Sequence, residues 1–121
     1  MKYICLVYHD EDARVGEKSA EELAEIHGAV REFIDELRMA DRHCFSAPLQ
    51  PPETAVVMRL DRGAITVTDG PFVETREVLA GFYIFEARDL NDAIRIAART
   101  PSARFGSIEV RPLIETLVMD H

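Results

Sequence analysis

The chain has 121 residues, 47% of them hydrophobic, which is about one domain's worth and enough for one closed core, so residues 1–121 are predicted to form a single domain. Its 22 acidic and 14 basic side chains give a formal net charge of -8, which argues against a nucleic-acid partner because phosphate binding needs clustered Lys and Arg. No apolar run approaches the roughly 20 residues that span a bilayer, and the N-terminus lacks a secretory signal core, so we expect a cytoplasmic protein without a membrane segment.

The first third of the chain predicts a strand, a loop and a long helix. Apolar residues from Tyr3 to Tyr8 indicate a buried strand that ends where charge begins at His9-Asp10. A polar loop follows over residues 9–18, and Ser19 with Glu22 then has capping-box spacing. A helix of about twenty residues is predicted by apolar side chains that recur at steps of three and four: Leu23, Ile26, Val30, Phe33 and Leu37.

The middle of the chain predicts another strand and then a hairpin. His43 to Leu49 could form the strand, and Gln50-Pro51-Pro52 interrupts regular pairing. Ala55 to Leu60 and Ala64 to Thr68 are β-rich runs separated by Asp61-Arg62-Gly63, where Gly is available for a positive φ. These two runs therefore predict a β-hairpin.

The last third predicts a strand, a helix and a strand. Leu79 to Ala87 is dense in aromatic and β-branched residues, as is typical of a central strand. Asp89 with Asp92 can cap a second helix that stops before Pro101, and Ser107 to Leu113 closes as a strand. The whole order predicts an α+β protein with the ferredoxin-like βαββαβ pattern and an inserted β-hairpin.

Two helices can cover only one face of a four-stranded sheet, yet neither face of the central strands is polar. In the later strand the alternating sets are Phe82 with Ile84 and Tyr83 with Phe85. The first strand alternates in the same way, with Tyr3, Cys5 and Val7 on one face and Ile4, Leu6 and Tyr8 on the other. An uncovered apolar face is best explained by a second copy, so we predict a homodimer with sheets facing each other.

The last strand is different because one of its faces is charged. Ile108 and Val110 take one face, and Glu109 and Arg111 take the other. The charged pair could point into a sheet-lined cavity and serve a small-molecule ligand. An edge strand with a solvated face explains the same pattern, and the sequence leaves both interpretations open.

The segment Thr68-Asp69-Gly70-Pro71-Phe72-Val73-Glu74-Thr75-Arg76, followed by Gly81-Phe82-Tyr83, closely resembles the DGPF domain of the YCII-related family. The Lys2-Tyr3 strand, the Pro48-Leu49-Gln50-Pro51-Pro52 segment and the closing Gly106 to Pro112 add to the match, so the likeness covers nearly the whole chain. The resemblance implies a dimeric α/β-barrel built from ferredoxin-like protomers.

The resemblance also implies two classes of function. One branch of the wider family resembles a dehydrochlorinase of chlorinated hydroxyquinols, with a His and Asp pair as its machinery, which suggests a small-molecule enzyme of the lyase class. The DGPF branch often lies beside, or is fused to, extracytoplasmic-function sigma factors, which suggests instead a non-catalytic ligand-binding or regulatory module associated with such a factor.

Asp69 and His27 are the candidate catalytic residues. The Asp69 carboxylate could reach into a cavity as a base, although a turn-forming Asp that bonds its own backbone is commoner. His27 lies on the shoulder of the helix stripe and should be partly buried, where its imidazole could move a proton with Asp69 orienting it. A half-buried helical His without a role is the alternative.

Four further residues are candidates for ligand binding. His9 could share the pocket mouth with Tyr83 and Arg111, and the Arg111 guanidinium could hold an anionic or phenolic ligand. A salt bridge to a neighbouring carboxylate is the alternative for Arg111. Phe72 is a candidate within the turn, although packing on the core would also explain it.

Metals, cofactors and disulfides are not expected from the sequence. The four His residues are far apart and lack metal-ligand spacing, and no Gly-rich phosphate loop follows a strand. Cys5 and Cys44 lie in apolar strand-like contexts, where a buried free thiol is the expected state in a chain without export signals.

Overall fold

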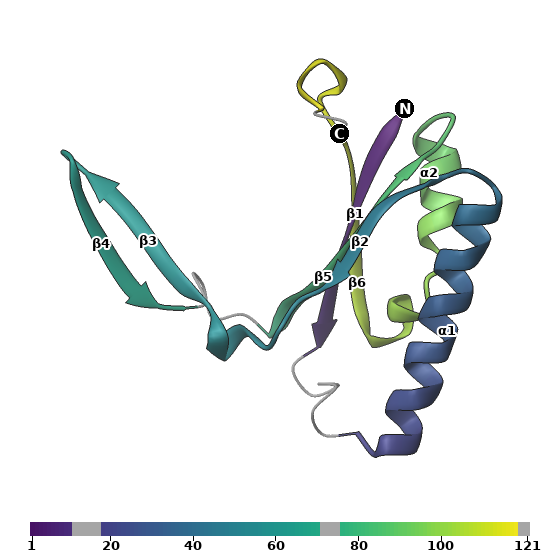
Figure 1. Cartoon of the computed structure of the whole chain (residues 1–121), viewed down its shortest axis with the longest axis horizontal. Helices are drawn as coiled ribbons and strands as arrows, with labels where there is room; N and C mark the ends of the chain where they lie inside the picture. The colour runs from purple at the N-terminus through teal and green to yellow at the C-terminus, as the bar shows by residue number, and fades with distance from the viewer. Residues whose placement is uncertain (11–17, 71–75, 119–121) are drawn as a thin grey trace.

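A computed structural model of the chain describes residues 1–10, 18–70 and 76–118 (Figure 1). The elements follow one another as strand, helix, strand, hairpin, strand, helix and strand, which confirms the predicted order. They are β1 (Lys2–Asp10), α1 (Ala20–Met39), β2 (His43–Pro48), β3 (Val56–Asp61), β4 (Ala64–Asp69), β5 (Glu77–Glu86), α2 (Leu90–Ala97) and β6 (Gly106–Pro112), with 3-10 turns η3 (Pro52–Thr54), η4 (Pro101–Phe105) and η5 (Glu115–Leu117).

The strands form two separate antiparallel sheets. The larger sheet has four strands in the order β2-β5-β1-β6, and the smaller one consists of β3 paired with β4. Both helices lie on one side of the four-stranded sheet, and the β3–β4 hairpin projects from the opposite side (Figure 1). The chain is thus a mixed α/β protein in which one sheet face is covered by helices.

Each helix begins at the cap that its sequence indicates. The Ser19 hydroxyl accepts a hydrogen bond from the Glu22 backbone N–H at 3.1 Å, and the Asp89 carboxylate accepts one from the Asp92 N–H at 2.8 Å. α1 turns Phe33 and Leu37 fully into the core, and the other members of its predicted stripe are half-buried. Neither helix of the described residues combines the length and apolarity needed to cross a bilayer.

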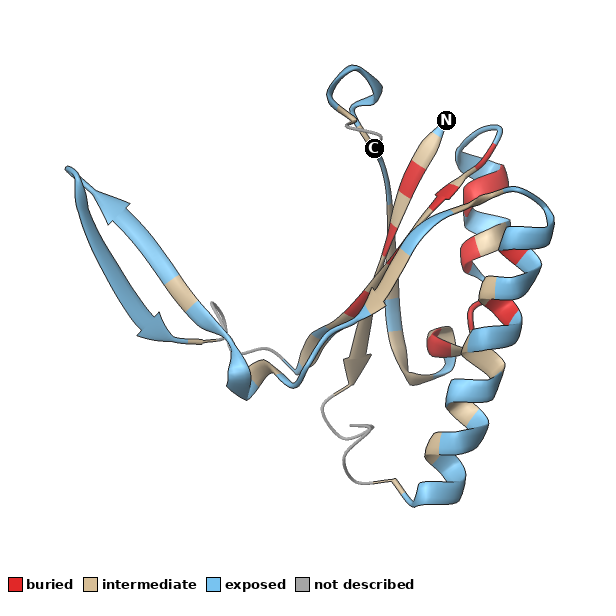
Figure 2. Cartoon of the chain, viewed as in Figure 1, coloured by how far each residue is buried: buried red, intermediate tan, exposed pale blue. Residues whose placement is uncertain are grey.

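The core lies between the helices and the four-stranded sheet. Buried side chains alternate along β1 and β5 and pack against buried side chains of the two helices (Figure 2). The whole core consists of Tyr3, Cys5, Val7, Phe33, Leu37, Tyr83, Phe85, Ala87, Ala93 and Ala97. Burial raises the pKa of the Cys5 thiol to about 12. Cys44 is also free but exposed, so its expected burial is wrong.

A polar cluster fastens the start of α2 to the corner between α1 and β2. The buried Asp92 carboxylate lies 2.9 Å from Arg42 Nη1 and 3.3 Å from Arg88 Nη2, and it accepts the Arg88 backbone N–H at 2.9 Å. These contacts, led by the backbone bond from Arg88, hold the pKa of Asp92 well below its usual range. The ionised carboxylate therefore stabilises the packing of α2 on the sheet.

Candidate functional site

One face of the four-stranded sheet is not covered by a helix, and its centre is apolar. Ile4 pairs with Ile84 and Leu6 pairs with Phe82, and all four side chains are half-buried in the single chain. Phe45 on β2 is 57% exposed, and its ring centroid lies 5.9 Å from that of Phe82. We call these five residues the open face. Its apolar, partly exposed side chains make it a surface that is stabilised by being covered.

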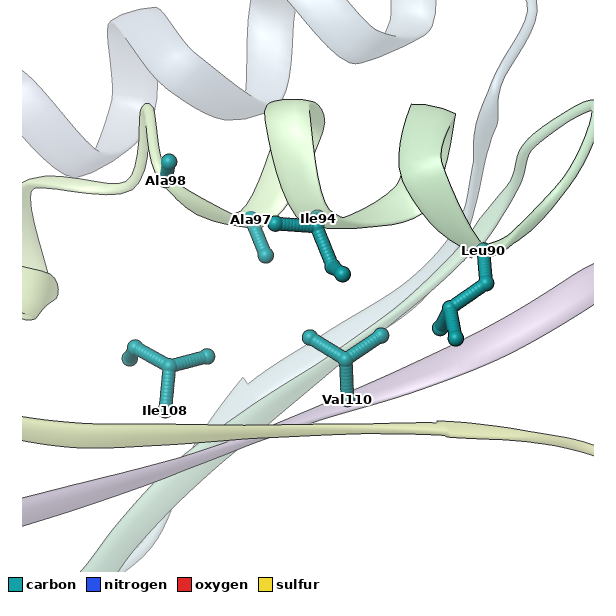
Figure 3. Close-up of a pocket in the computed structure, with 6 residues that line it drawn as sticks. All are labelled: Leu90, Ile94, Ala97, Ala98, Ile108 and Val110. Atoms are coloured by element: carbon teal, nitrogen blue, oxygen red, sulfur yellow. The ribbon is translucent and has the colours of Figure 1, made fainter.

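The edge strand β6 adds polar side chains to the open face. Ser107, Glu109 and Arg111 alternate with Ile108 and Val110, which point toward α2 (Figure 3). The antiparallel register sets the polar three beside the outward residues of β1, with Ser107 opposite Tyr8, Glu109 opposite Leu6 and Arg111 opposite Ile4. The edge of the sheet therefore combines hydroxyl, carboxylate and guanidinium groups next to an apolar surface.

A hollow of about 360 Å³ lies at this edge, lined by Tyr8, Glu77, Ser107, Ile108 and Glu109. We call it the polar pocket. Its volume lies at the lower end of the range of small-molecule sites, and in the single chain it is open to solvent. The Ser107 hydroxyl donates a hydrogen bond to the Glu77 carboxylate at 2.8 Å, so the pocket contains a hydroxyl that holds a carboxylate in place.

Arg111 forms an ion pair with Glu109 beside the polar pocket. Its side chain is 68% exposed, so the guanidinium has further N–H donors directed to solvent. The predicted salt bridge to a neighbouring carboxylate is therefore present. The ligand role of Arg111 stays a prediction, because one guanidinium can hold a carboxylate and an anionic ligand together.

Tyr83 lies on the opposite face of the sheet from Arg111. Its side chain is 6% exposed, and its ring packs edge-on against Phe33 with 5.3 Å between centroids. Its hydroxyl accepts a hydrogen bond from Thr100 Oγ1 at 3.2 Å. The prediction that Tyr83 and Arg111 share one pocket is wrong, because Tyr83 pairs in register with the buried Cys5. Tyr83 is a core residue.

His9 packs away from the polar pocket, against η4. Its ring centroid lies 6.0 Å from that of Phe105, at an interplanar angle of 72°. Burial, and secondarily the charge of Lys18, lowers the pKa of His9 below its ordinary value. Its Nε2 atom is buried without a hydrogen-bond partner among the described residues. A neutral imidazole in this place offers no positive charge to an anion, and His9 does not line the pocket.

His27 and Asp69 are not brought together within one chain. His27 is exposed on α1, so its expected partial burial is wrong: a turn of about 100° per residue carries it from Ile26 out of the buried stripe. Asp69 ends β4 on the hairpin, which projects from the other side of the sheet (Figure 1). The His27–Asp69 pair therefore has no support within the protomer.

The Asp69 carboxylate itself is exposed. No hydrogen bond to its side chain is formed by the part of the chain that the structure describes, so the alternative of a carboxylate bonded to its own turn is not observed there. Its catalytic role stays a prediction. Phe72, the remaining candidate, lies outside the described residues. Among the residues that are described, no three His, Cys, Asp or Glu side chains form a group that could hold a metal ion.

Four lining residues of the polar pocket were not among the predicted site residues: Tyr8, Glu77, Ser107 and Ile108. Tyr8 lies four residues after Ile4, and Ser107 lies two residues before Glu109. Because alternate residues of a strand share a face, the sequence places Tyr8 and Ser107 on the same face as those residues. Glu77 reaches the pocket because β5 begins opposite the end of β1. That register joins segments far apart in the chain, and no local pattern reveals it.

Comparison with known proteins identifies the family to which the chain belongs. A model of the YCII-related domain matches residues 1–117. The chain belongs to the YCII-related family. A relative from Rhizobium meliloti (strain 1021), the uncharacterized protein R00369, is 31% identical over 118 residues, which cover 93% of this chain and 92% of that protein.

A solved structure shares the fold. It is the 5-chloro-2-hydroxyhydroquinone dehydrochlorinase TftG from Burkholderia phenoliruptrix AC1100, in complex with 2,5-dihydroxybenzoquinone. The similarity covers 93% of each chain with a TM-score of 0.52 and 14% sequence identity. At this identity the likeness shows a shared fold and leaves the activity to be argued from the site.

Proposed function

We propose that this YCII-related protein is a small-molecule enzyme of the lyase class that acts on a phenolic or quinonoid ring bound at the open face. The observation that carries the proposal is the polar pocket of about 360 Å³ beside a sheet face rich in apolar side chains. Apolar area holds the faces of a ring, and a few convergent polar groups orient it.

The site is completed in this proposal by a second copy. The open face of one chain leaves a ligand exposed to water, and facing it with the same surface of a partner would bury both. We therefore include a homodimer, built as a dimeric α/β barrel of ferredoxin-like protomers, in the proposed function. Exclusion of water would also strengthen every polar contact inside the cavity.

The ligand class follows from the groups that line the site. Phe45 and Phe82 offer aromatic surface to a planar ring. Arg111 can bind an ionised ring oxygen through its free N–H donors, and Tyr8 and Ser107 can donate to neutral oxygens. A dehydrochlorinase of the same fold binding 2,5-dihydroxybenzoquinone supports this class of compound.

The chemistry would be an elimination, in which a base takes a proton, the electron pair left behind forms a new π bond in the ring compound, and the leaving group departs as an anion with its own bonding pair. We assign the base to Glu77, whose carboxylate already accepts a hydrogen bond from Ser107 at 2.8 Å. Arg111 would stabilise negative charge on the ring oxygen as the proton leaves. This assignment replaces the His27–Asp69 pair within one protomer.

Binding tests the ligand site directly. Calorimetric titration with 2,5-dihydroxybenzoquinone should show binding to the wild-type protein and about 10-fold or greater weakening in Arg111→Ala, since a hydrogen bond to a charged group contributes about 1.5–3 kcal/mol. Arg31→Ala is the matched control, because Arg31 is exposed on α1, on the helix-covered side. Unchanged affinity in Arg111→Ala would remove Arg111 from the site.

Turnover tests the chemistry separately. Chloride release from 5-chloro-2-hydroxyhydroquinone should be lost in Glu77→Gln, while the affinity for 2,5-dihydroxybenzoquinone stays within a few-fold of wild type. Binding without chloride release from the wild-type protein would contradict this reaction and favour a non-catalytic binding module. Absence of binding would contradict the whole proposal.

A further inference from the structure

The β3–β4 hairpin is apolar on one face only. Directly paired residues of an antiparallel hairpin share a face, and here Met58 pairs with Val67 and Leu60 with Ile65. The apolar face, which we call the hairpin strip, is formed by side chains that are each between 60% and 68% exposed: Val56, Met58, Leu60, Ile65 and Val67. The other face is mixed, with Val57 and Ala64 beside the polar residues Arg59, Asp61, Thr66 and Thr68.

The hairpin strip has nothing to cover it within its own chain. β3 and β4 contact mainly each other, and the hairpin stands clear of the four-stranded sheet (Figure 1). An isolated two-stranded hairpin is marginally stable in water unless a hydrophobic face packs against something else. The strip is therefore expected to pack on another surface in the working protein.

A second exposed apolar surface lies between α2 and β6. This α2–β6 groove has a volume of about 420 Å³, and its lining has no charged side chain: Leu90, Ile94, Ala97, Ala98, Ile108 and Val110 (Figure 3). Leu90 and Ile94 are each 49% exposed. The two alanines leave room above the β6 side chains for apolar groups from outside.

The strip and the groove cannot meet in one chain, because the hairpin and α2 lie on opposite sides of the sheet (Figure 1). A second copy supplies each surface with its complement. In a two-fold dimer the strip of one copy can contact the groove of the other, and the same contact is repeated by symmetry. No further protein is needed to cover either surface.

Size and charge agree with this pairing. The six-residue strands of the hairpin are about 20 Å long and the seven-residue β6 about 24 Å, at about 3.4 Å per residue. Asp69 lies two residues after Val67 and pairs with Val56, so it is on the same face of the hairpin, at the end of the strip. Arg95 is exposed and follows the groove residue Ile94 on α2, although it does not itself line the groove. Neither Asp69 nor Arg95 has an ion pair within residues 1–10, 18–70 and 76–118, and their charges are opposite.

We propose that the β3–β4 hairpin is an arm that packs its apolar strip into the α2–β6 groove of a second copy of this chain. The inference rests on the homodimer of the proposed function, but it needs neither the polar pocket nor any chemistry there. It assigns a partner to two surfaces that the facing sheets leave uncovered. In this arrangement Asp69 lies on the hairpin face that contacts the partner chain.

Matched substitutions on the two faces of the hairpin test the arm. Leu60→Asp puts a charge into the strip and should raise the dimer dissociation constant at least 100-fold in sedimentation velocity. Thr66→Asp puts the same charge on the other face and should leave that constant unchanged. Ile94→Asp in the groove should reproduce the loss seen with Leu60→Asp. Dimers of wild-type strength in both Leu60→Asp and Ile94→Asp would overturn the arm.

The contact itself can be observed in the wild-type protein, so the test does not depend on how the variants fold. Equal amounts of methyl-labelled and unlabelled chain, unfolded and refolded together, should give intermolecular nuclear Overhauser effects from the Leu60, Ile65 and Val67 methyl groups to Ile94 and Val110 of the unlabelled partner. Intermolecular effects between open faces without any from the hairpin would overturn the arm and leave the proposed dimer intact. A monomer would overturn both.

Discussion

Phe45→Ala tests whether the open face is the surface between two copies. Full burial of a Phe side chain contributes about 1.5–3 kcal/mol. Phe45 is 57% exposed in the single chain, so its burial on association would contribute about 57% of this free energy. Phe45 contributes twice to a two-fold interface, so truncation should weaken the dimer by about 1.7–3.4 kcal/mol. This corresponds to a roughly 20- to 300-fold higher dissociation constant.

Sedimentation equilibrium over a wide range of protein concentrations measures this change. Met39→Ala is the control, because Met39 is 90% exposed at the end of α1, on the helix-covered side. Its dimer dissociation constant should equal that of the wild type. Equal constants for Phe45→Ala and wild type, or an equal loss in Met39→Ala, would refute the assignment of the open face to the interface.

Three predictions concern the stability and the core of the protomer. Gly28→Ala should raise the free energy of unfolding in urea by about 0.5–1 kcal/mol, because a Cβ there meets nothing within 4 Å inside a long helix; a decrease would mean that another group approaches Gly28. Native protein at pH 8 should expose one fast-reacting thiol, Cys44, since Cys5 is buried and its pKa is about 12; two fast thiols would contradict the core. The lowered pKa of Asp92 makes its stabilising contribution complete above the ordinary carboxyl pKa of 3.8 and lost as the pH falls below it. Asp92→Asn should therefore lower the melting temperature at pH 7 and make it fall less than in the wild type as the pH drops below about 4; an equally steep fall would refute this role.

The order of elements could be predicted from the sequence because its signals are local. Ser19 and Asp89 cap the two helices as their spacing indicates, and the turn between β3 and β4 places Gly63 at a φ of 81°. The alternation along β1 and β5 also separated the two faces of the sheet correctly. Each of these signals lies within a few residues of the structure that it specifies.

The grouping of site residues could be predicted only in part, because it depends on the register between distant strands. Glu109 and Arg111 were recognised as an outward-facing charged pair, and they lie at the edge of the open face. Tyr83 was assigned to their pocket although it pairs with Cys5 on the buried side. His27 was expected at the edge of the buried stripe, and a single residue step around α1 leaves it exposed. Register and helix rotation are set by packing of the whole sheet, so the local sequence does not determine them.

The open face is the proposed ligand site, and isotope-labelled side chains on the two faces of the sheet can test this directly. Isoleucine methyl groups report on both sides of the sheet, with Ile4 and Ile84 on the open face and Ile34 and Ile96 packed against the core. Titration of the methyl-labelled protein with 2,5-dihydroxybenzoquinone should shift the Ile4 and Ile84 resonances saturably and leave those of Ile34 and Ile96 in place. Shifts confined to Ile34 and Ile96, or no saturable shift at all, would contradict the assignment of the site to this face.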